Sequence, residues 1–330
     1  MTTDSLPVPA DSPRRTSHDH DGDPGHHREP GHHRGRGLAP GGRPRFRFPL
    51  RMLRQGAGRQ HHAGPFTYIL LIVAAVLSLF PLYWTMVAAS SDNTRVTQTP
   101  PPFLPGPHLF ENLGKAWQDA ALGKAMANSL IVAGVIALST VLFATLAGFA
   151  FAKLRFKGRN ALLMLVIGTM MVPPQLAVVP LFMMMTDLGW GQKLPAVIFP
   201  TLVSAVGVFF MRQYLSEALP DELVEAGRVD GAHSLRIFWS IVLPIARPAM
   251  AVLFMITFVH AWNDFFWPFI VLDMTNPTVP VALTQLSAGY VRDQSLIMAG
   301  ALLGTLPLLA MFIVFGRQIV GGIMQGAVKG

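Results

Sequence analysis

The stretch that decides the fold is residues 66–89, FTYILLIVAAVLSLFPLYWTMVAA, which contains no charged side chain. A helix of about 20 apolar residues crosses the hydrocarbon core of a bilayer. These 24 residues are therefore long enough to span a membrane as a helix. The run begins too far into the chain, and is too long, to be the apolar part of a signal peptide.

Five further runs with almost no charge follow the first one. They cover residues 125–152, 160–185, 194–211, 248–269 (with one Asp) and 296–316. None alternates apolar and polar residues as a barrel strand does, and in lipid each segment must satisfy its own backbone polar groups. We therefore expect an all-α membrane protein with six transmembrane helices.

The composition of the whole chain agrees with this class. Of its 330 residues, 51% are hydrophobic and only 13% are charged, against roughly 25% charged residues in ordinary soluble proteins. A surface so poor in charge excludes a soluble enzyme. The absence of cysteine from the sequence excludes disulfides, thiolate metal sites and cysteine nucleophiles.

The N-terminal residues 1–60 differ from the remainder of the chain. They hold eleven Arg and six acidic residues within a segment rich in Gly, Pro and His. Such a segment buries too little apolar surface to fold, so we expect a disordered tail followed by a transmembrane domain over 61–330. Almost nothing apolar occurs there before Phe46, whereas nucleic-acid binding needs basic residues interleaved with aromatics on a folded face, so we do not expect it. Neighbouring imidazoles could share a metal ion, but we favour a solvated tail and no metal site for His26, His27, His32, His33, His61 and His62.

The distribution of Lys and Arg predicts the orientation in the membrane. With the N-terminus in the cytoplasm, 21 of these residues lie on the cytoplasmic side and five on the other. Short cytoplasmic loops carry an excess of positive charge. Both termini are therefore expected in the cytoplasm of a multi-pass protein of the cell inner membrane.

The segment 212–247 is longer than a simple connection between spans. Acidic residues surround a predicted helix start after Pro220, where they favour the positive end of the helix dipole. Gly231 provides a position at which the chain can turn sharply. From the residues alone, an amphipathic helix on the membrane surface remains the simplest interpretation.

The same segment carries a motif of several spaced positions. Residues 225–248 read EAGRVDGAHSLRIFWSIVLPIARP, with Glu225, Ala226, Gly231, Leu243 and Pro244 at its defining places. This run resembles the EAA loop of binding-protein-dependent ABC importer permeases. The family pattern has Ala where this chain has Gly227, a change of one small residue for another.

Other stretches are similar to the maltose-type carbohydrate branch of that family. They are Asn128 and Ser129, the run LAGFAFAKLRFKGR at 146–159, the triplet 262–264 and the closing GAVKG at 326–330. The resemblance covers most of residues 66–330. It implies a type I ABC importer permease fold and the import of a sugar or oligosaccharide.

The resemblance also implies partners and a coupling site. In the family this loop forms a short helix that docks on a separate ATPase. The partners implied are two ATPase subunits, a second permease subunit of different sequence and an extracytoplasmic solute-binding protein, besides membrane lipid. No GxxxxGK[ST] phosphate loop occurs in the sequence, so we expect no cofactor bound by this chain and no enzymatic activity of its own. The coupling residues implied are Glu225, Ala226, Gly227, Asp230, Gly231, Leu243 and Pro244.

Polar residues within the spans are candidates for the substrate path, because they are costly in lipid unless paired or wetted. Trp262, Asn263 and Asp264 combine an aromatic face with polar groups, as carbohydrate sites do; anchoring at the membrane interface is the alternative for the tryptophan. Gln175 follows Pro173 and Pro174 in the third span, where a hinge, a cavity wall or a packed kink would each explain the prolines.

Two alternatives to this function stay open from the sequence. An ion-coupled secondary transporter would use an intramembrane acid such as Asp264 as its coupling site. An ABC permease for a solute other than a sugar would share every motif above.

Overall fold

The computed structural model describes residues 64–288 and 292–327, with side chains up to residue 316, and this part of the chain contains helices and no strand. The predicted tail over 1–60, its histidine pairs and residues 328–330 lie outside the described residues. In chain order the helices are α1 (Pro65–Ser90), α2 (Asn93–Val96), α3 (Leu109–Asp119), α4 (Leu122–Lys153), α5 (Arg159–Thr169), η1 (Pro174–Ala177), α6 (Val178–Asp187), α7 (Pro195–Ile198), η2 (Phe199–Thr201), α8 (Ala205–Ala218), α9 (Asp221–Val229), α10 (Ser234–Ile237), the π-helix η3 (Phe238–Val242), α11 (Leu243–Asn263), α12 (Phe266–Val271), α13 (Val279–Leu283), η4 (Gln285–Ser287) and α14 (Gln294–Ala327).

Four helical stretches are long and apolar enough to cross a membrane: Pro65–Ser90, Leu122–Lys153, Ser234–Asn263 and Gln294–Gly316. Two bent helix pairs raise the number to six if each pair counts as one span, as the sequence predicted. The fifth predicted span needs correction at both ends. Its helical stretch begins at Ser234 and ends at Asn263, so Asp264 lies beyond α11 and α12 is a separate helix.

The third predicted span is broken and not merely kinked. α5 and the η1–α6 segment meet at an angle of 86°. Pro173 has an extended backbone (φ −60°, ψ 126°) because it precedes Pro174, and neither proline has an amide to donate. A regular helix therefore cannot run on through Val172 to Pro174, and α5 ends at Thr169. The break between η2 and α8 is smaller, 41°, and the Ser204 hydroxyl caps the new helix by accepting from the amide of Gly207 at 3.2 Å.

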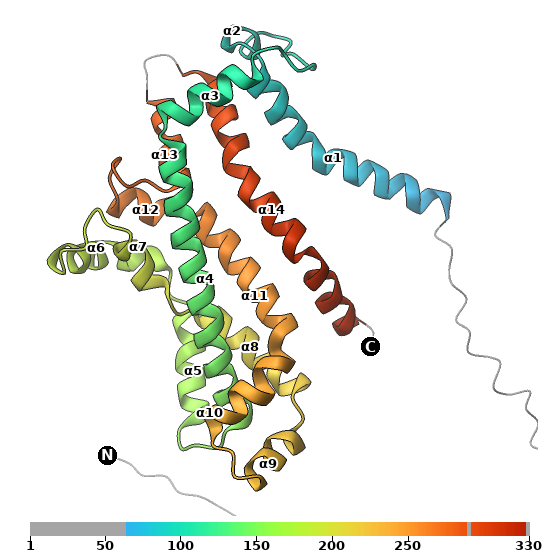
Figure 1. Cartoon of the computed structure of the whole chain (residues 1–330), viewed down its shortest axis with the longest axis vertical. Helices are drawn as coiled ribbons and strands as arrows, with labels where there is room; N and C mark the ends of the chain where they lie inside the picture. Colours follow the sequence, from blue (N-terminus) through green and yellow to red (C-terminus); the bar gives the residue numbers. More distant parts are fainter. Residues whose placement is uncertain (1–63, 289–291, 328–330) are drawn as a thin grey trace, which may run out of the picture. The chain divides into compact units, whose positions relative to one another are not determined.

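The long helix α4 lies at the centre of the described bundle and packs against α8 and α11 (Figure 1). Glycines on both α4 and α8 allow these two helices to approach each other closely. A Cβ on Gly148 would lie 2.8 Å from both the amide nitrogen of Arg212 and the Cβ of Met211. A Cβ on Gly207 would lie 3.2 Å from Ala144 and Thr140 of α4. Small residues commonly bring helices together in membranes, where lipid tails compete with apolar side chains.

Buried polar groups near the start of α4 hold the segment before α13. The Asn128 amide donates to the carbonyl of Pro277 at 3.0 Å, and the backbone amide of Val279 donates to the Ser129 hydroxyl at 2.8 Å. The motif residues Asn128 and Ser129 therefore satisfy backbone groups of a distant loop, as buried polar atoms require.

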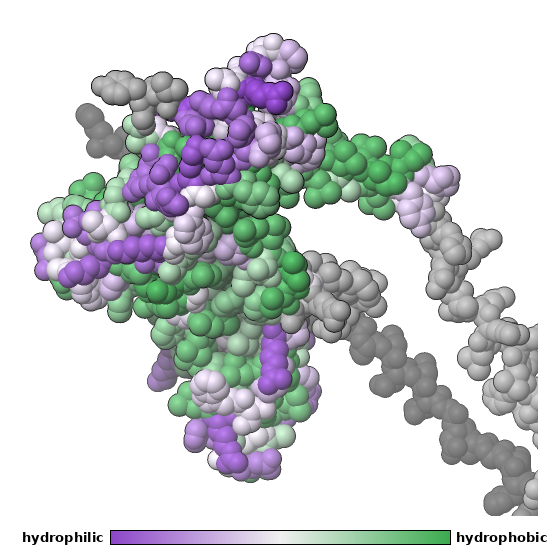
Figure 2. Space-filling model, turned by 45° about the horizontal axis from the view of Figure 1, so that its top comes forward, coloured by the Kyte–Doolittle hydropathy of each residue, from purple (hydrophilic) through white to green (hydrophobic). Residues whose placement is uncertain are grey.

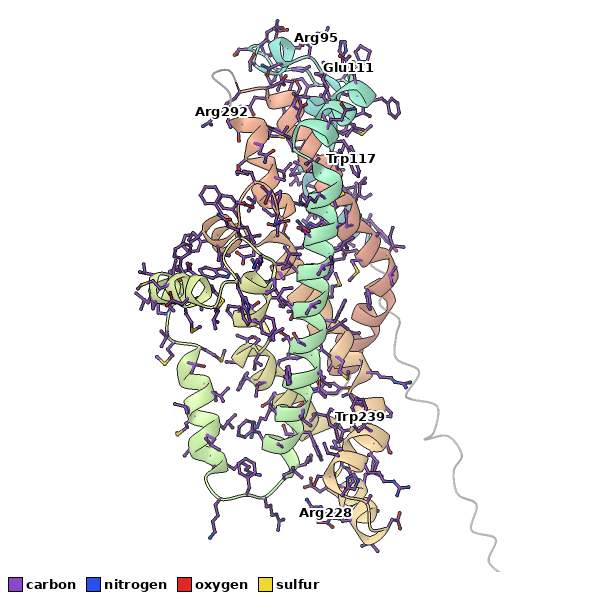
Figure 3. All side chains as sticks on the ribbon, turned by 60° about the vertical axis from the view of Figure 1, so that its left-hand side comes forward. Arg95, Glu111, Trp117, Arg228, Trp239 and Arg292 are labelled. Carbon is purple, nitrogen blue, oxygen red and sulfur yellow. The ribbon has the colours of Figure 1, made fainter. Side chains whose placement is uncertain are left out.

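Charged and polar residues gather at the ends of the bundle, and apolar side chains cover the surface between them (Figure 2). Arg95, Glu111 and Arg292 lie at the end formed by α2 and α3, and Arg228 lies at the end formed by α9 and α10 (Figure 3). The residues of α1 from 66 to 82 are exposed, while Val87 to Ser90 are buried near α3. This distribution is the one that a lipid environment requires.

The contact of α4 with α8 should fail when its glycine gains a branched side chain. We expect Gly148→Val to destabilise the protein by about 1–3 kcal/mol or more, because the added methyl groups meet backbone atoms that cannot move aside. Gly134→Val on the same helix is the matched control, since a Cβ there has nothing within 4 Å. The measurement is the thermal unfolding midpoint in detergent. Equal midpoints for the two variants would contradict the close contact.

Candidate coupling helix and substrate path

The coupling segment is built around the short helix α9. Pro220 precedes it with an extended backbone (φ −62°, ψ 140°), Asp221 and Glu222 occupy the first turn, and Arg228 occupies the last turn. Acids near the start and a base near the end both favour the helix dipole. The helix start predicted after Pro220 is confirmed.

One face of α9 packs inward and the other is uncovered. Val224 and Gly227 are the buried residues of this helix. Leu223 is 43% exposed and Val229 is 88% exposed, and Ala226 between them is exposed as well. Residues three apart share a helix face, so α9 presents an apolar stripe to its surroundings. Glu225 is also exposed, next to this stripe.

The end of α9 is closed by a Schellman motif. Gly231 has a left-handed backbone (φ 76°), its amide donates to the carbonyl of Arg228 at 3.0 Å, and the amide of Ala232 donates to the carbonyl of Gly227 at 2.9 Å. The amide of Asp230 continues the helix by donating to Ala226 at 3.0 Å. Glycine is preferred at this position because it has no Cβ to clash in the left-handed region. The turn predicted at Gly231 is confirmed.

Gly227 lets α9 rest directly on the following helical stretch. A Cβ at this position would lie 3.3 Å from the Cγ1 of Ile237 and from the Cδ1 of Ile241. Both isoleucines belong to the hydrophobic cluster that also contains Val224. Where the family has Ala, this chain has the smaller Gly227, and the side chains that face it, Ile237 and Ile241, are large.

The helical stretch below α9 contains a wide turn. Phe238–Val242 form a π-helix between α10 and α11, just before Pro244. Proline lacks an amide and its ring would clash with the carbonyl four residues earlier, which explains the widening. Leu243 and Pro244 thus begin α11. The loop expected over 212–247 is mostly helical, and the connection between α8 and α10 is limited to residues 219–233.

An ion pair lies at the start of α9. The Asp221 carboxylate accepts a hydrogen bond from Nζ of Lys153 at 2.7 Å, and this bond lowers the pKa of Asp221 below its usual value. A carboxyl whose pKa is lowered by folding stabilises the fold above its unfolded pKa. That contribution is lost as the pH falls through the lowered pKa.

The structure places Trp262 in a packed interface. Its side chain is 2% exposed, stacks on Phe258 with 5.9 Å between ring centroids, and donates its indole N–H to the carbonyl of Gly304 at 3.2 Å. The aromatic face considered for sugar stacking is therefore covered by protein. Its burial also argues against the anchoring role at the membrane interface.

Asn263 faces the other way, into a groove of about 700 Å³. The lining residues come from α11 and α14: Val252, Met255, Ile256, Val259, His260, Asn263 and Phe312. His260 and Asn263 are the polar members of this lining, at the C-terminal end of α11. The two residues are three positions apart, so the sequence alone places them on one face of a helix.

Asp264 and Gln175 occupy different parts of the fold. Asp264 follows the last residue of α11 with an extended backbone (φ −66°, ψ 118°), and α12 begins two residues later at Phe266. It does not line the groove with Asn263. Gln175 is exposed in η1, at the break of the third span. Asp264 and Gln175 are therefore not brought together with Asn263 in one site.

No group of three or more His, Asp or Glu residues that could hold a metal ion occurs within the described part of the chain.

Comparison with known proteins gives one consistent family. The family model described as "Binding-protein-dependent transport system inner membrane component" matches residues 141–320. An sn-glycerol-3-phosphate transport system permease protein of Yersinia enterocolitica is 33% identical over 269 residues, covering 79% of this chain and 95% of that protein. A lactose transport system permease protein of Rhizobium radiobacter is 34% identical over 263 residues, with the same coverage.

Two further matches extend the comparison. An arabinooligosaccharides transport system permease protein of Halalkalibacterium halodurans is 32% identical over 266 residues, covering 78% of this chain and 93% of that protein. The crystal structure of a bacterial ABC transporter involved in the import of alginate contains a chain with the same fold. It superposes with a TM-score of 0.67 at 22% identity and covers 76% of this chain and 94% of that one.

The contrast between Trp262 and Asn263 can be measured as stability. We expect Trp262→Ala to lower the free energy of unfolding by roughly 3–5 kcal/mol, because it empties a packed site. Asn263→Ala should leave the thermal midpoint close to that of the unsubstituted protein, since its side chain is exposed and bonds only to the carbonyl of Val259 on its own helix. A large loss for Asn263→Ala, or none for Trp262→Ala, would contradict this placement.

Proposed function

The chain belongs to the family of binding-protein-dependent transport system inner membrane components, and from this premise we propose that it is the permease subunit of an ATP-driven importer for a sugar or oligosaccharide. A family of transport components implies a translocation subunit and not an enzyme. The solute class is supported by relatives named for lactose and for arabinooligosaccharides. The relative named for sn-glycerol-3-phosphate makes a phosphorylated polyol the second candidate solute.

The observation that carries the coupling role is the construction of α9. Its buried residues, Val224 and Gly227, pack against the protein, and it ends in a sharp turn at Gly231. Its other face exposes Leu223, Ala226 and Val229. A rigid helix with an uncovered apolar stripe suits a groove on another protein. We infer that this face, with Glu225 beside it, docks on the ATPase, and that Asp230, Leu243 and Pro244 shape its support.

The partners follow from this assignment. The family description makes the transport system dependent on a binding protein, and we propose that this protein delivers the solute. We propose in addition a second permease subunit of different sequence and two ATPase subunits. The ATPase chains supply nucleotide binding, since this chain carries no phosphate loop, and we propose that it binds no cofactor itself.

We infer that the groove beside Asn263 and His260 contributes to the substrate path. An amide and an imidazole can each bond a hydroxyl group, and the apolar walls between α11 and α14 suit the carbon face of a sugar ring. Trp262 supports this groove from behind through its contacts with Phe258 and Gly304.

The coupling role is tested by straining the turn after α9. Gly231→Val forces a branched side chain into a left-handed backbone, at a cost of about 1–2 kcal/mol or more, and tilts α9. We expect the protein to stay in the membrane while the ATPase subunits no longer co-purify with it. The matched control is Gly158→Val, because Gly158 has the same type of backbone (φ 81°) and equally open space around it. Undiminished co-purification for Gly231→Val would remove the basis of the coupling role.

The proposed orientation places the α9 end in the cytoplasm, because the basic residues of the short loops concentrate there. The sequence has no cysteine, so single cysteines can be introduced without background. We expect an impermeant thiol reagent to label Thr94→Cys in intact cells, and Ser234→Cys only after the membrane is permeabilised. Both positions are exposed. Labelling of Ser234→Cys in intact cells would invert the topology.

A further inference from the structure

The ion pair between Lys153 and Asp221 connects two helices that are far apart in the sequence. Lys153 is the last residue of α4, and Asp221 is the first residue of α9. Nζ of Lys153 lies 2.7 Å from Oδ1 of Asp221. The two residues are separated by 68 positions, so this contact exists only in the folded protein.

The lysine is held far more tightly than a surface lysine. Its side chain is 8% exposed, whereas that of Asp221 is 74% exposed. Nζ also lies 3.5 Å from the carbonyl of Ser216, in the last turn of α8. A lysine is rarely so buried unless its charge is paired. Nζ therefore marks the point at which α4, α8 and α9 meet.

The helix dipoles favour this arrangement of charges. Lys153 lies in the last turn of α4, where the carbonyl ends are negative, and Asp221 lies in the first turn of α9, where the amide ends are positive. The bond therefore draws together two helix ends of opposite polarity. A charge-assisted hydrogen bond is stronger and shorter than a neutral one, which suits a fixed link.

Apolar burial also attaches the beginning of α9, because Leu219, which is 1% exposed just before Pro220, lies in the same hydrophobic cluster as Val224. The buried residues of α9, Val224 and Gly227, lie in the middle and near the end of the helix, against the stretch that leads into α11. The start of α9 is joined to α8 through Leu219 and Pro220. α4, in contrast, packs against α3, α8, α11 and α13. The ion pair therefore adds a direct polar link between the start of α9 and the extensively packed α4, besides the apolar contacts of Leu219 and Val224.

We propose that Lys153 is a positioning residue for the coupling helix, and that its bond to Asp221 makes α9 and the end of α4 move as one body. The inference rests on the proposed coupling role of α9. Movement imposed on α9 by an ATPase would then reach α4 directly, and through α4 the helices that line the groove beside Asn263. Without the bond, α9 could tilt while α4 stays in place.

The test uses the full-length protein with spin labels on Leu146→Cys of α4 and Arg228→Cys of α9, both exposed positions. Pulsed electron spin resonance measures the distance distribution between the labels in lipid nanodiscs. We expect Lys153→Met and Asp221→Ala to broaden the distribution about twofold, because the start of α9 loses its bond to α4. Lys153→Arg and Asp221→Glu keep a bonded pair and should retain the narrow distribution. Lys157→Met removes a nearby exposed lysine and is the matched control.

The same labels report on coupling in the complex that co-purifies with the chain. When ATP and vanadate trap the ATPase, the distance should stay constant in the unsubstituted protein and shift in Asp221→Ala. An unchanged distribution in both Lys153→Met and Asp221→Ala would overturn the inference. Loss of the narrow distribution in Lys153→Arg and Asp221→Glu would do the same. Failure of the proposed function is distinguishable, because Gly231→Val would then retain its ATPase while the nanodisc measurement still reports on the ion pair.

Discussion

The close contact between α4 and α8 is the constraint on which the rest of the structure depends. Gly148 and Gly207 remove the side chains that would separate the two helices, and each faces atoms of the other helix at a distance that no Cβ could occupy comfortably. Since lipid offers apolar side chains an equally apolar surrounding, this geometric fit replaces the hydrophobic effect as the source of specificity. It also brings the end of α4 to the end of α8, where α9 begins.

The proposed coupling helix α9 shows how a short element can be rigid without being buried. Nine residues cannot form a stable helix alone in water. α9 is nevertheless held by the packing of Gly227 against the following helical stretch, by a Schellman motif at Gly231 and by an ion pair at Asp221. These three attachments lie at its middle, end and start. Its remaining face is free to expose Leu223 and Val229. Such a helix can transmit force from a partner, because its own backbone has little freedom to absorb it.

Most polar groups within the spans already have structural partners. Trp262 bonds to the carbonyl of Gly304, Trp267 bonds to the carbonyl of Ala196 at 3.0 Å, and Asn128 bonds to the carbonyl of Pro277. Asp264 lies beyond the end of α11, and the family assignment excludes the secondary transporter that would have used it as a coupling site. Asn263 and His260 remain as polar groups that face a groove. A polar group within a span needs a partner that offsets its desolvation, and only the packing shows which partner it has.

The sequence by itself determined the features that depend on local chemistry. The uncharged run at 66–89 predicted a spanning helix, Pro173 and Pro174 predicted a bend, and Gly231 predicted a turn. The motif at 225–248 identified the family. The 86° break, the inward direction of Trp262 and the ion pair of Lys153 with Asp221 were decided by the tertiary structure. The physical reason is that these features depend on contacts between residues far apart in the chain, and helical periodicity cannot show which neighbour each face will meet.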